Sequence, residues 1–368
     1  MDIDKLFVIK KDVIDIKKFY NSNFFNSYNL TNYVFRGQGD KEYTLLPSAF
    51  RKTEDNKKLW SYNYSSNWEF IITEIRNIML FYRICNKNGL FLPQIPNWLL
   101  DNSNCNFINM KIFKEKYLSK NKNWIDDNLK ELFALAQHYG MPTRLLDWTY
   151  QFNTALYFGA MDSLEKTKKD FSVWGLNVSL LEDFKNFLLT SKIEEYFGAM
   201  DSLEKTKKDF SIQGLNVSLL EDLKKFLLTS KIEEISSMAF PLTFIVPKYH
   251  DNININAQKG VLSLWEVNIS EIYEQTLQDE HLQKLDDAPL ERLLRRFIEN
   301  HSDLYDEFIK KCPLYKRQAI LVKFNFKYNE CRDILINLKS QGIDYSHIYP
   351  GYRSVITQIK KEKILDIF

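Results

Sequence analysis

Residues 135–149 read LAQHYGMPTRLLDWT and join two segments with different residue patterns. The residues before Gly140 are apolar at helical spacing and follow an acidic first turn, which predicts a helix. Gly140 supplies a stop for this helix, and Pro142 cannot continue its hydrogen-bond ladder. A second helix with a small, apolar face is expected around residues 155–159. A charged, aromatic loop or short strand held between two buried helices is typical of a binding surface.

The bulk composition indicates a folded protein with no general affinity for nucleic acid. The chain has 368 residues, of which 45% are hydrophobic and 15% aromatic, so a substantial core is available. Its 50 basic and 48 acidic residues give a formal net charge of +2. This balance disfavours nucleic-acid binding over the whole molecule, because such proteins usually concentrate positive charge.

Several functional classes lack their sequence signals. The charged start of the chain does not resemble a signal peptide, and no apolar run reaches the roughly 18 residues that span a bilayer. The four cysteines form no CxxC pair and the five histidines are scattered, so no metal site is expected. Neither a P-loop nor a GxSxG elbow is present. We therefore expect a cytoplasmic protein without a membrane partner.

The N-terminal part contains an unusual Arg-Gly pair. Residues 33–38, YVFRGQ, have the β-branched and aromatic composition of a strand. Gly37 would allow close approach of backbone or ligand, and Arg36 offers a planar fork of donors suited to phosphate or carboxylate. Arg36 could equally pair with a core carboxylate and order the loop. The residues of this segment alone slightly favour that structural interpretation.

Residues 157–195 and 196–234 form a tandem repeat with an offset of 39, and the copies differ at four positions. Two near-identical copies inside a unique chain indicate a recent duplication, since solenoids need about three divergent units. One copy is expected to belong to the fold and the other to be an insertion. Trp174 is replaced by Gln213 in the second copy, so we assign the first copy's strand to the core.

Strands and helices alternate irregularly through the rest of the chain. The apolar pattern predicts a long helix within residues 62–84, and the alternation in residues 253–257 is typical of a strand. Without regular βαβ spacing, the expected class is α+β, with a mixed, mainly antiparallel sheet and peripheral helices. Further strands are expected at 242–247 and 319–326, and further helices at 14–25, 270–313, 330–341 and 355–363.

Several motifs resemble the FRG-domain family. FRGQ at residues 35–38 resembles the motif that gives the family its name, and QHYGMPTRLLDWT at 137–149 resembles its most distinctive block. WGLN at 174–177, AQKGVLS at 257–263 and SHIYP at 346–350 are similar to later family segments. The resemblance implies a single domain over residues 1–368. It would carry a helical insertion at about 52–130, the duplication, and a C-terminal part at 241–368 that completes the sheet.

The order of these motifs is also similar to that of ADP-ribosyltransferase-like folds, which implies NAD as the ligand. By this similarity Arg36, His138 and Gln258 are candidate catalytic residues. Gln258 occupies the place of a catalytic carboxylate but carries no negative charge, which Asp147 or Glu266 could supply. The candidate cofactor-binding residues are Arg36, Gly37, Gln38, Tyr139, Thr143, Arg144, Trp148 and Thr149.

Each of these residues also has an ordinary structural interpretation. His138 could cap a helix C-terminus, and Trp148 could belong to the core. Arg144 and Asp147 are three positions apart and are expected to form an ion pair with each other. Gln258 could satisfy a buried backbone group.

Two hypotheses follow from the sequence. The first is a toxin-like or phage-defence effector that binds NAD and transfers ADP-ribose to a macromolecular acceptor, protein or nucleic acid, or consumes NAD. The second is a non-catalytic nucleotide-sensing or protein-interaction module, whose duplicated segment contacts a partner such as an antitoxin protein.

Overall fold

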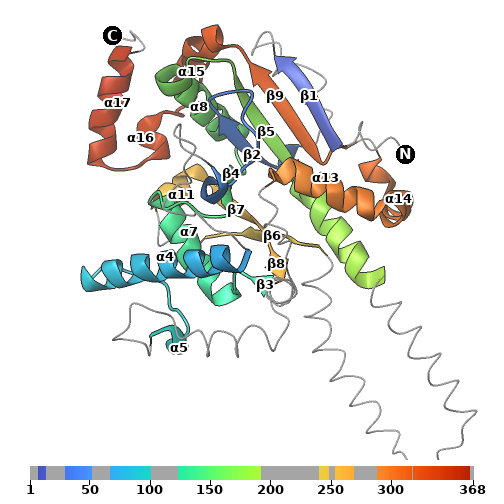
Figure 1. The fold of residues 1–368 in the computed structure, drawn as a ribbon. Helices are drawn as coiled ribbons and strands as arrows, with labels where there is room; N and C mark the ends of the chain where they lie inside the picture. The colour runs from blue at the N-terminus through green and yellow to red at the C-terminus, as the bar shows by residue number, and fades with distance from the viewer. Residues whose placement is uncertain are drawn as a thin grey trace, which may run out of the picture.

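The fold is built on a seven-stranded sheet with helices on both faces (Figure 1). The computed structural model describes residues 7–13, 30–51, 67–100, 123–191, 240–247, 253–268, 288–316 and 318–364. The strand order is β1-β9-β5-β2-β4-β7-β6. Only β1 and β9 are parallel, and every other neighbouring pair in this sheet is antiparallel. The expected α+β class with a mixed, mainly antiparallel sheet is confirmed.

The strands are short, and β2 lies in the middle of the sheet. All six residues of β2 are in register with β5, whereas its register with β4 consists of the single pair Phe35 and Thr149. The strands of the large sheet are β1 (Val8–Val13), β2 (Tyr33–Gln38), β4 (Leu145–Thr149), β5 (Phe171–Asn177), β6 (Leu242–Ile245), β7 (Gly260–Trp265) and β9 (Leu321–Phe326). A separate ribbon pairs β3 (Asn123–Trp124) with β8 (Val267–Asn268).

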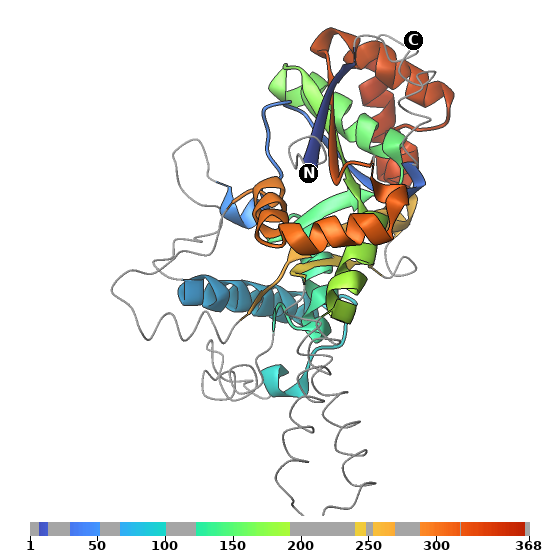
Figure 2. The same cartoon turned by 90° about the vertical axis from the view of Figure 1, so that its right-hand side faces the viewer.

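Helices pack against different parts of the sheet. α8 packs on β2, and Figures 1 and 2 place α8 and α15 in one half of the molecule and the long α4 in the other. None of the helices in the described ranges is both long and apolar enough to cross a bilayer. The helices are α4 (Asn67–Lys87), α5 (Asn97–Leu100), α7 (Asp127–His138), α8 (Phe152–Asp162), α11 (Ile253–Gln258), α13 (Leu290–Asn300), α14 (Ser302–Lys311), α15 (Cys331–Ser340), α16 (Tyr345–Ile348) and α17 (Tyr352–Ile364).

The helix α8 lies unusually close to β2 at Gly37. A Cβ atom on Gly37 would lie 1.9 Å from the carbonyl oxygen of Ala155 and 2.6 Å from the amide nitrogen of Gly159. Both contacts are with helix backbone, which cannot move aside as a side chain can. The absence of a side chain at Gly37 is therefore required for the packing of α8 on the sheet.

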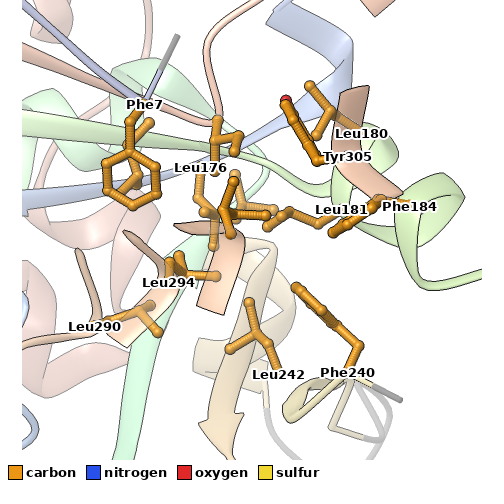
Figure 3. Close-up of a cluster of buried hydrophobic side chains, with 14 of the residues drawn as sticks. Phe7, Leu176, Leu180, Leu181, Phe184, Phe240, Leu242, Leu290, Leu294 and Tyr305 are labelled. Atoms are coloured by element: carbon orange, nitrogen blue, oxygen red, sulfur yellow. The ribbon is translucent and has the colours of Figure 1, made fainter. Parts of the chain in front are cut away.

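The two faces of the sheet bury separate apolar cores. On the α8 side, Tyr33 and Phe35 pack with residues of α8, β9 and α15. On the other side, Val34 and Trp174 pack with α13, α14 and the helical residues 178–191. Figure 3 shows part of this second core, in which Leu176, Leu180 and Leu294 converge. The period-2 alternation of β2 thus divides its side chains between two cores.

A third core, between α4, α7 and the β4–β7 part of the sheet, contains a buried ion pair. Arg144 Nε donates to both carboxylate oxygens of Glu74, each at 3.0 Å. Glu74 is completely buried and also accepts from the indole nitrogen of Trp124 at 3.0 Å. Arg144 donates further to the carbonyl oxygens of Trp124 and Trp265. The pair therefore links α4 to β3, to β7 and to the residue that precedes β4.

Most expected elements are present. The helix-stop prediction at Gly140 is confirmed by its left-handed φ of 91°. The strand expected at residues 33–38 is β2, the long helix within 62–84 corresponds to α4, and the strand after Pro142 is β4. The strand expected over residues 253–257 is wrong, because these residues form the helix α11 and the strand β7 begins only at Gly260. Ile255 is buried whereas Asn254 and Asn256 are more exposed, and a short helix can satisfy the same pattern.

The first copy of the tandem repeat contains a central strand. Every residue of β5, including Trp174, is buried between β2 and β9, which confirms the assignment of this strand to the core. The second copy, residues 196–234, lies outside the described residues, as does the helix expected at 14–25. The proposed insertion at 52–130 lies partly outside them, and its domain assignment stays a prediction. The β1 strand was not anticipated from the sequence.

The close approach of α8 predicts a large effect of Gly37→Ala. The added methyl group has to displace helix backbone, so the free energy of unfolding should fall by about 3 kcal/mol or more. Gly260→Ala is the matched control, because its added Cβ would meet its nearest neighbour at an ordinary 3.4 Å. Urea denaturation of both variants measures the effect. Equal stabilities would contradict the packing argument.

The buried ion pair predicts that Glu74→Ala destabilises the fold by roughly 3–5 kcal/mol, because it leaves Arg144 charged and buried without its carboxylate. As a control, Glu299→Ala removes the partner of Arg295 from a half-exposed surface pair on α13. It should cost less than about 1 kcal/mol. Thermal or urea unfolding would reveal this contrast, and a Glu74 variant as stable as the Glu299 variant would refute it.

Candidate functional site

Asp147 is an exposed charged residue in the middle of an otherwise buried strand. The other four residues of β4 are buried, whereas the Asp147 side chain is 62% exposed. β4 pairs with β7 along all five of its residues, but its register with β2 stops after Phe35 and Thr149. The carbonyl group of Asp147 therefore faces a gap in the ladder between β2 and β4.

The side chain of Arg36 bridges this gap. Its Nη1 atom donates to the carbonyl oxygen of Asp147 at 2.8 Å and lies 3.4 Å from the carboxylate oxygen Oδ2. The guanidinium thus takes over an acceptor that a β2 backbone amide would otherwise satisfy. Arg36 consequently completes the pairing between two strands of the sheet and also contacts the exposed carboxylate of Asp147.

Gln137, at the end of α7, holds the other oxygen of the carboxylate. Its amide Nε2 donates to Asp147 Oδ1 at 2.8 Å and lies 3.3 Å from the carbonyl oxygen of Leu145. The amide orientation follows from its other side, where Oε1 accepts a hydrogen bond from the hydroxyl of the buried Thr143. The carboxylate is therefore oriented by two neighbours and still faces solvent.

Two ionisable side chains lie near this carboxylate. Burial lowers the pKa of His138, and the charge of Asp147 opposes that shift, so the imidazole is mainly neutral at pH 7. Burial, followed by the influence of Tyr345 and of Asp147, raises the pKa of Tyr349 to about 12. The ring of the largely exposed Tyr139 lies edge-on to that of His138, with centroids 5.3 Å apart.

A second arginine adds positive charge. Arg51 follows the short helix η2 (Ser48–Phe50), and its Nε donates to the carbonyl oxygen of Leu46 at 2.9 Å. The pKa of the Arg51 guanidinium is lowered, mainly by the protein atoms around it and next by the charge of Arg36. Arg51 and Arg36 are therefore close enough to influence each other's charge. We call the group Arg36, Arg51, Gln137, His138, Asp147 and Tyr349 the Asp147 site.

The Asp147 site combines the features of an anion-binding surface with those of an acid–base site. The Arg36 Nε atom is buried and makes no hydrogen bond. Together with Arg51 it offers donors for an anionic group such as a phosphate. Asp147 offers an oriented negative charge, and the neutral His138 can accept a proton. No group of three or more potential metal ligands occurs among the described residues.

Gln258 lies at the border of the site and connects two elements. Its backbone carbonyl accepts a hydrogen bond from the hydroxyl of Thr149 at 2.6 Å. Its side-chain amide lies 3.4 Å from the carbonyl oxygen of Ile348, at the end of α16. Gln258 thereby helps to hold the segment that carries Tyr349.

Other candidate residues serve the fold. Arg144 pairs with Glu74, so the expected ion pair between Arg144 and Asp147 is wrong; Asp147 pairs with Arg36. The reason is that Arg144 precedes β4 and is buried against α4, whereas Asp147 lies in the middle of β4 and is exposed. Three further candidates make structural contacts. Trp148 is buried and donates a hydrogen bond to Ser263, and Gln38 is buried and accepts one from Trp174. Gly37 packs against the backbone of α8.

Some residues of the site were not among the sequence candidates. Asp147 was considered only as a substitute for the charge that Gln258 lacks, and Gln137, Arg51 and Tyr349 were not singled out. Gln137 and Asp147 lie within the distinctive block at 137–149, so their polarity was an available signal. Arg51 and Tyr349 carry no local signal, because only the fold brings these segments beside β4.

Comparison with known proteins gives one family. Residues 31–169 match the family model of the FRG domain. The match contains every residue of the Asp147 site except Tyr349. It ends before the later motifs at 174–177, 257–263 and 346–350, whose assignment stays an interpretation. No curated protein and no solved structure matches the chain.

Proposed function

We propose that the Asp147 site, most of which lies within the residues that match the FRG-domain model, binds NAD and cleaves the bond between nicotinamide and ribose. The products would be nicotinamide and an ADP-ribose group that is transferred to a macromolecular acceptor or to water. In a cell such an activity would suit a toxin-like or phage-defence effector.

The observation that carries this proposal is the exposed Asp147 carboxylate, held in place by Arg36 and Gln137. Cleavage of the glycosidic bond develops positive charge on the ribose, and an oriented carboxylate stabilises such a charge. Gln258 is neutral and lies at the border of the site. Asp147 therefore supplies the charge that Gln258 cannot.

The other side chains have complementary tasks in the proposed reaction. Arg36 and Arg51 would bind the two phosphates of NAD, and the exposed ring of Tyr139 offers a surface for stacking. The bond between ribose C1′ and the nicotinamide nitrogen breaks, and its electron pair leaves with neutral nicotinamide. An acceptor oxygen then forms the new bond to C1′, and its proton passes to His138.

The alternative is a non-catalytic nucleotide-sensing module. One observation favours it: Asp147 is paired with Arg36, so the site carries its own counter-ion without a ligand. In that case NAD or a related nucleotide would compete for Arg36, and binding would change the contact between β2 and β4 without turnover. The same experiment separates the two functions.

The test incubates the purified protein with NAD, with and without a crude cell lysate, and measures nicotinamide release. Asp147→Asn should lower the rate by at least about 100-fold while leaving NAD binding measurable by calorimetry. Arg36→Ala should weaken binding as well as abolish release, because it removes both a phosphate donor and the support of Asp147.

Asp127→Asn provides the matched control, because Asp127 is a 90% exposed carboxylate at the start of α7, at the opposite end from Gln137 and His138. It should release nicotinamide at the rate of the unchanged protein. Circular dichroism verifies that all variants are folded. Binding without release would support the sensing module, whereas neither binding nor release would reject both functions.

A further inference from the structure

The C-terminal helix α17 exposes its apolar side chains to solvent. Tyr352 is 96% exposed, Val355 47%, Ile356 57% and Ile359 41%. Their spacing of i, i+3, i+4 and i+7 places them on one side of the helix, as a continuous stripe. Figure 1 shows α17 at the periphery of the molecule, beside α16 and α15. We call these four residues the α17 stripe.

The side of α17 that faces the protein is polar. The Gln358 side-chain oxygen accepts a hydrogen bond from the Tyr345 amide at 2.9 Å. Lys361 forms an ion pair with Glu165 from η5 (Ser163–Thr167), and its ammonium group lies 5.0 Å from the centre of the Tyr345 ring. Glu362 forms an ion pair with Lys339 of α15 at 2.5 Å.

This arrangement is the reverse of an ordinary surface helix, which buries its apolar side and exposes its polar one. The polar contacts define the rotation of α17 about its axis, so the stripe cannot turn inward without breaking them. Four clustered apolar side chains exposed on one helix mark an interaction site more often than chance surface variation.

The charges beside the stripe point to an acidic partner. Arg353 and Lys360 lie on one flank of the stripe, are exposed, and form no ion pair among the described residues. On the other flank, the charge of Glu362 is balanced by Lys339. The exposed charge next to the stripe is therefore positive.

We propose that the α17 stripe is the docking surface for an amphipathic helix of a partner protein, whose acidic residues contact Arg353 and Lys360. Its apolar residues would pack on the stripe as in other helix–helix recognition. This surface is separate from the Asp147 site, so the proposal does not depend on NAD chemistry.

A second copy of the chain fits this surface poorly. A two-fold axis that pairs two α17 helices in antiparallel orientation brings the same flank of both copies together. Arg353 and Lys360 of one copy would then lie beside those of the other. An acidic helix removes the repulsion.

The experiment measures binding of two synthetic helical peptides to the full chain by fluorescence anisotropy at low salt. Both carry leucines at i, i+3, i+4 and i+7; one has glutamates on its flank and the other lysines. The glutamate peptide should bind at least 10-fold more tightly. Ile356→Gln with Ile359→Gln should weaken its binding at least 10-fold, and Arg353→Glu with Lys360→Glu should reverse the preference between the peptides.

Ile336→Gln is the matched control, since Ile336 is a 39% exposed isoleucine on α15 outside the stripe; it should leave binding unchanged. Failure to prefer the glutamate peptide, or equal binding by the stripe variants, overturns the proposal. A concentration-dependent dimer in sedimentation that Ile356→Gln abolishes would also overturn the proposal. So would binding of the protein to phosphatidylglycerol-containing vesicles, lost in the stripe variants, without binding to either peptide.

Discussion

The contact between the backbone of α8 and Gly37 of β2 is the constraint on which the arrangement of the sheet depends. No side chain fits between them, so α8 packs directly on the middle strand and orients its Tyr33 and Phe35 into one core. The preceding residue, Arg36, then extends into the gap beside β4, where its guanidinium reaches Asp147. The Arg-Gly pair thus has two linked roles: the glycine allows the helix to approach, and that approach determines where the arginine lies.

The gap between β2 and β4 brings a structural arginine into contact with an exposed carboxylate. In a continuous ladder the Asp147 carbonyl would face a backbone donor, and Arg36 would have no acceptor there. Since the register stops at Phe35 and Thr149, the guanidinium completes the ladder, and the adjacent carboxylate stays exposed. Gln137, at the end of α7, then donates a hydrogen bond to the other oxygen of this carboxylate and so limits its rotation. The structural and functional interpretations of Arg36 are therefore compatible, because one side chain satisfies both.

Charged residues serve three different purposes in this fold, and burial distinguishes them. Glu74 and Arg144 are removed from water, so they must satisfy each other and connect α4 to the sheet. Arg36 and Asp147 are paired at the surface, where a ligand can compete for either. Around α17, ion pairs hold the inner side of a helix whose apolar residues face outward. The same residue types thus occur in a buried pair, in an exposed pair and along the inner side of a helix, according to how much solvent reaches them.

The sequence by itself determined the class of the fold, its main elements and the match of residues 31–169 to the FRG domain. Helix periodicity, the stop at Gly140 and the composition of β2 are local properties, so they can be recognised without the structure. It also indicated Arg36, His138 and the block at 137–149 as a candidate surface. Only the tertiary structure decided the partners: Arg144 pairs with Glu74, Asp147 with Arg36, and Arg51 and Tyr349 join from distant segments. These pairings depend on strand register and helix packing between residues far apart in the chain, which local sequence patterns do not encode.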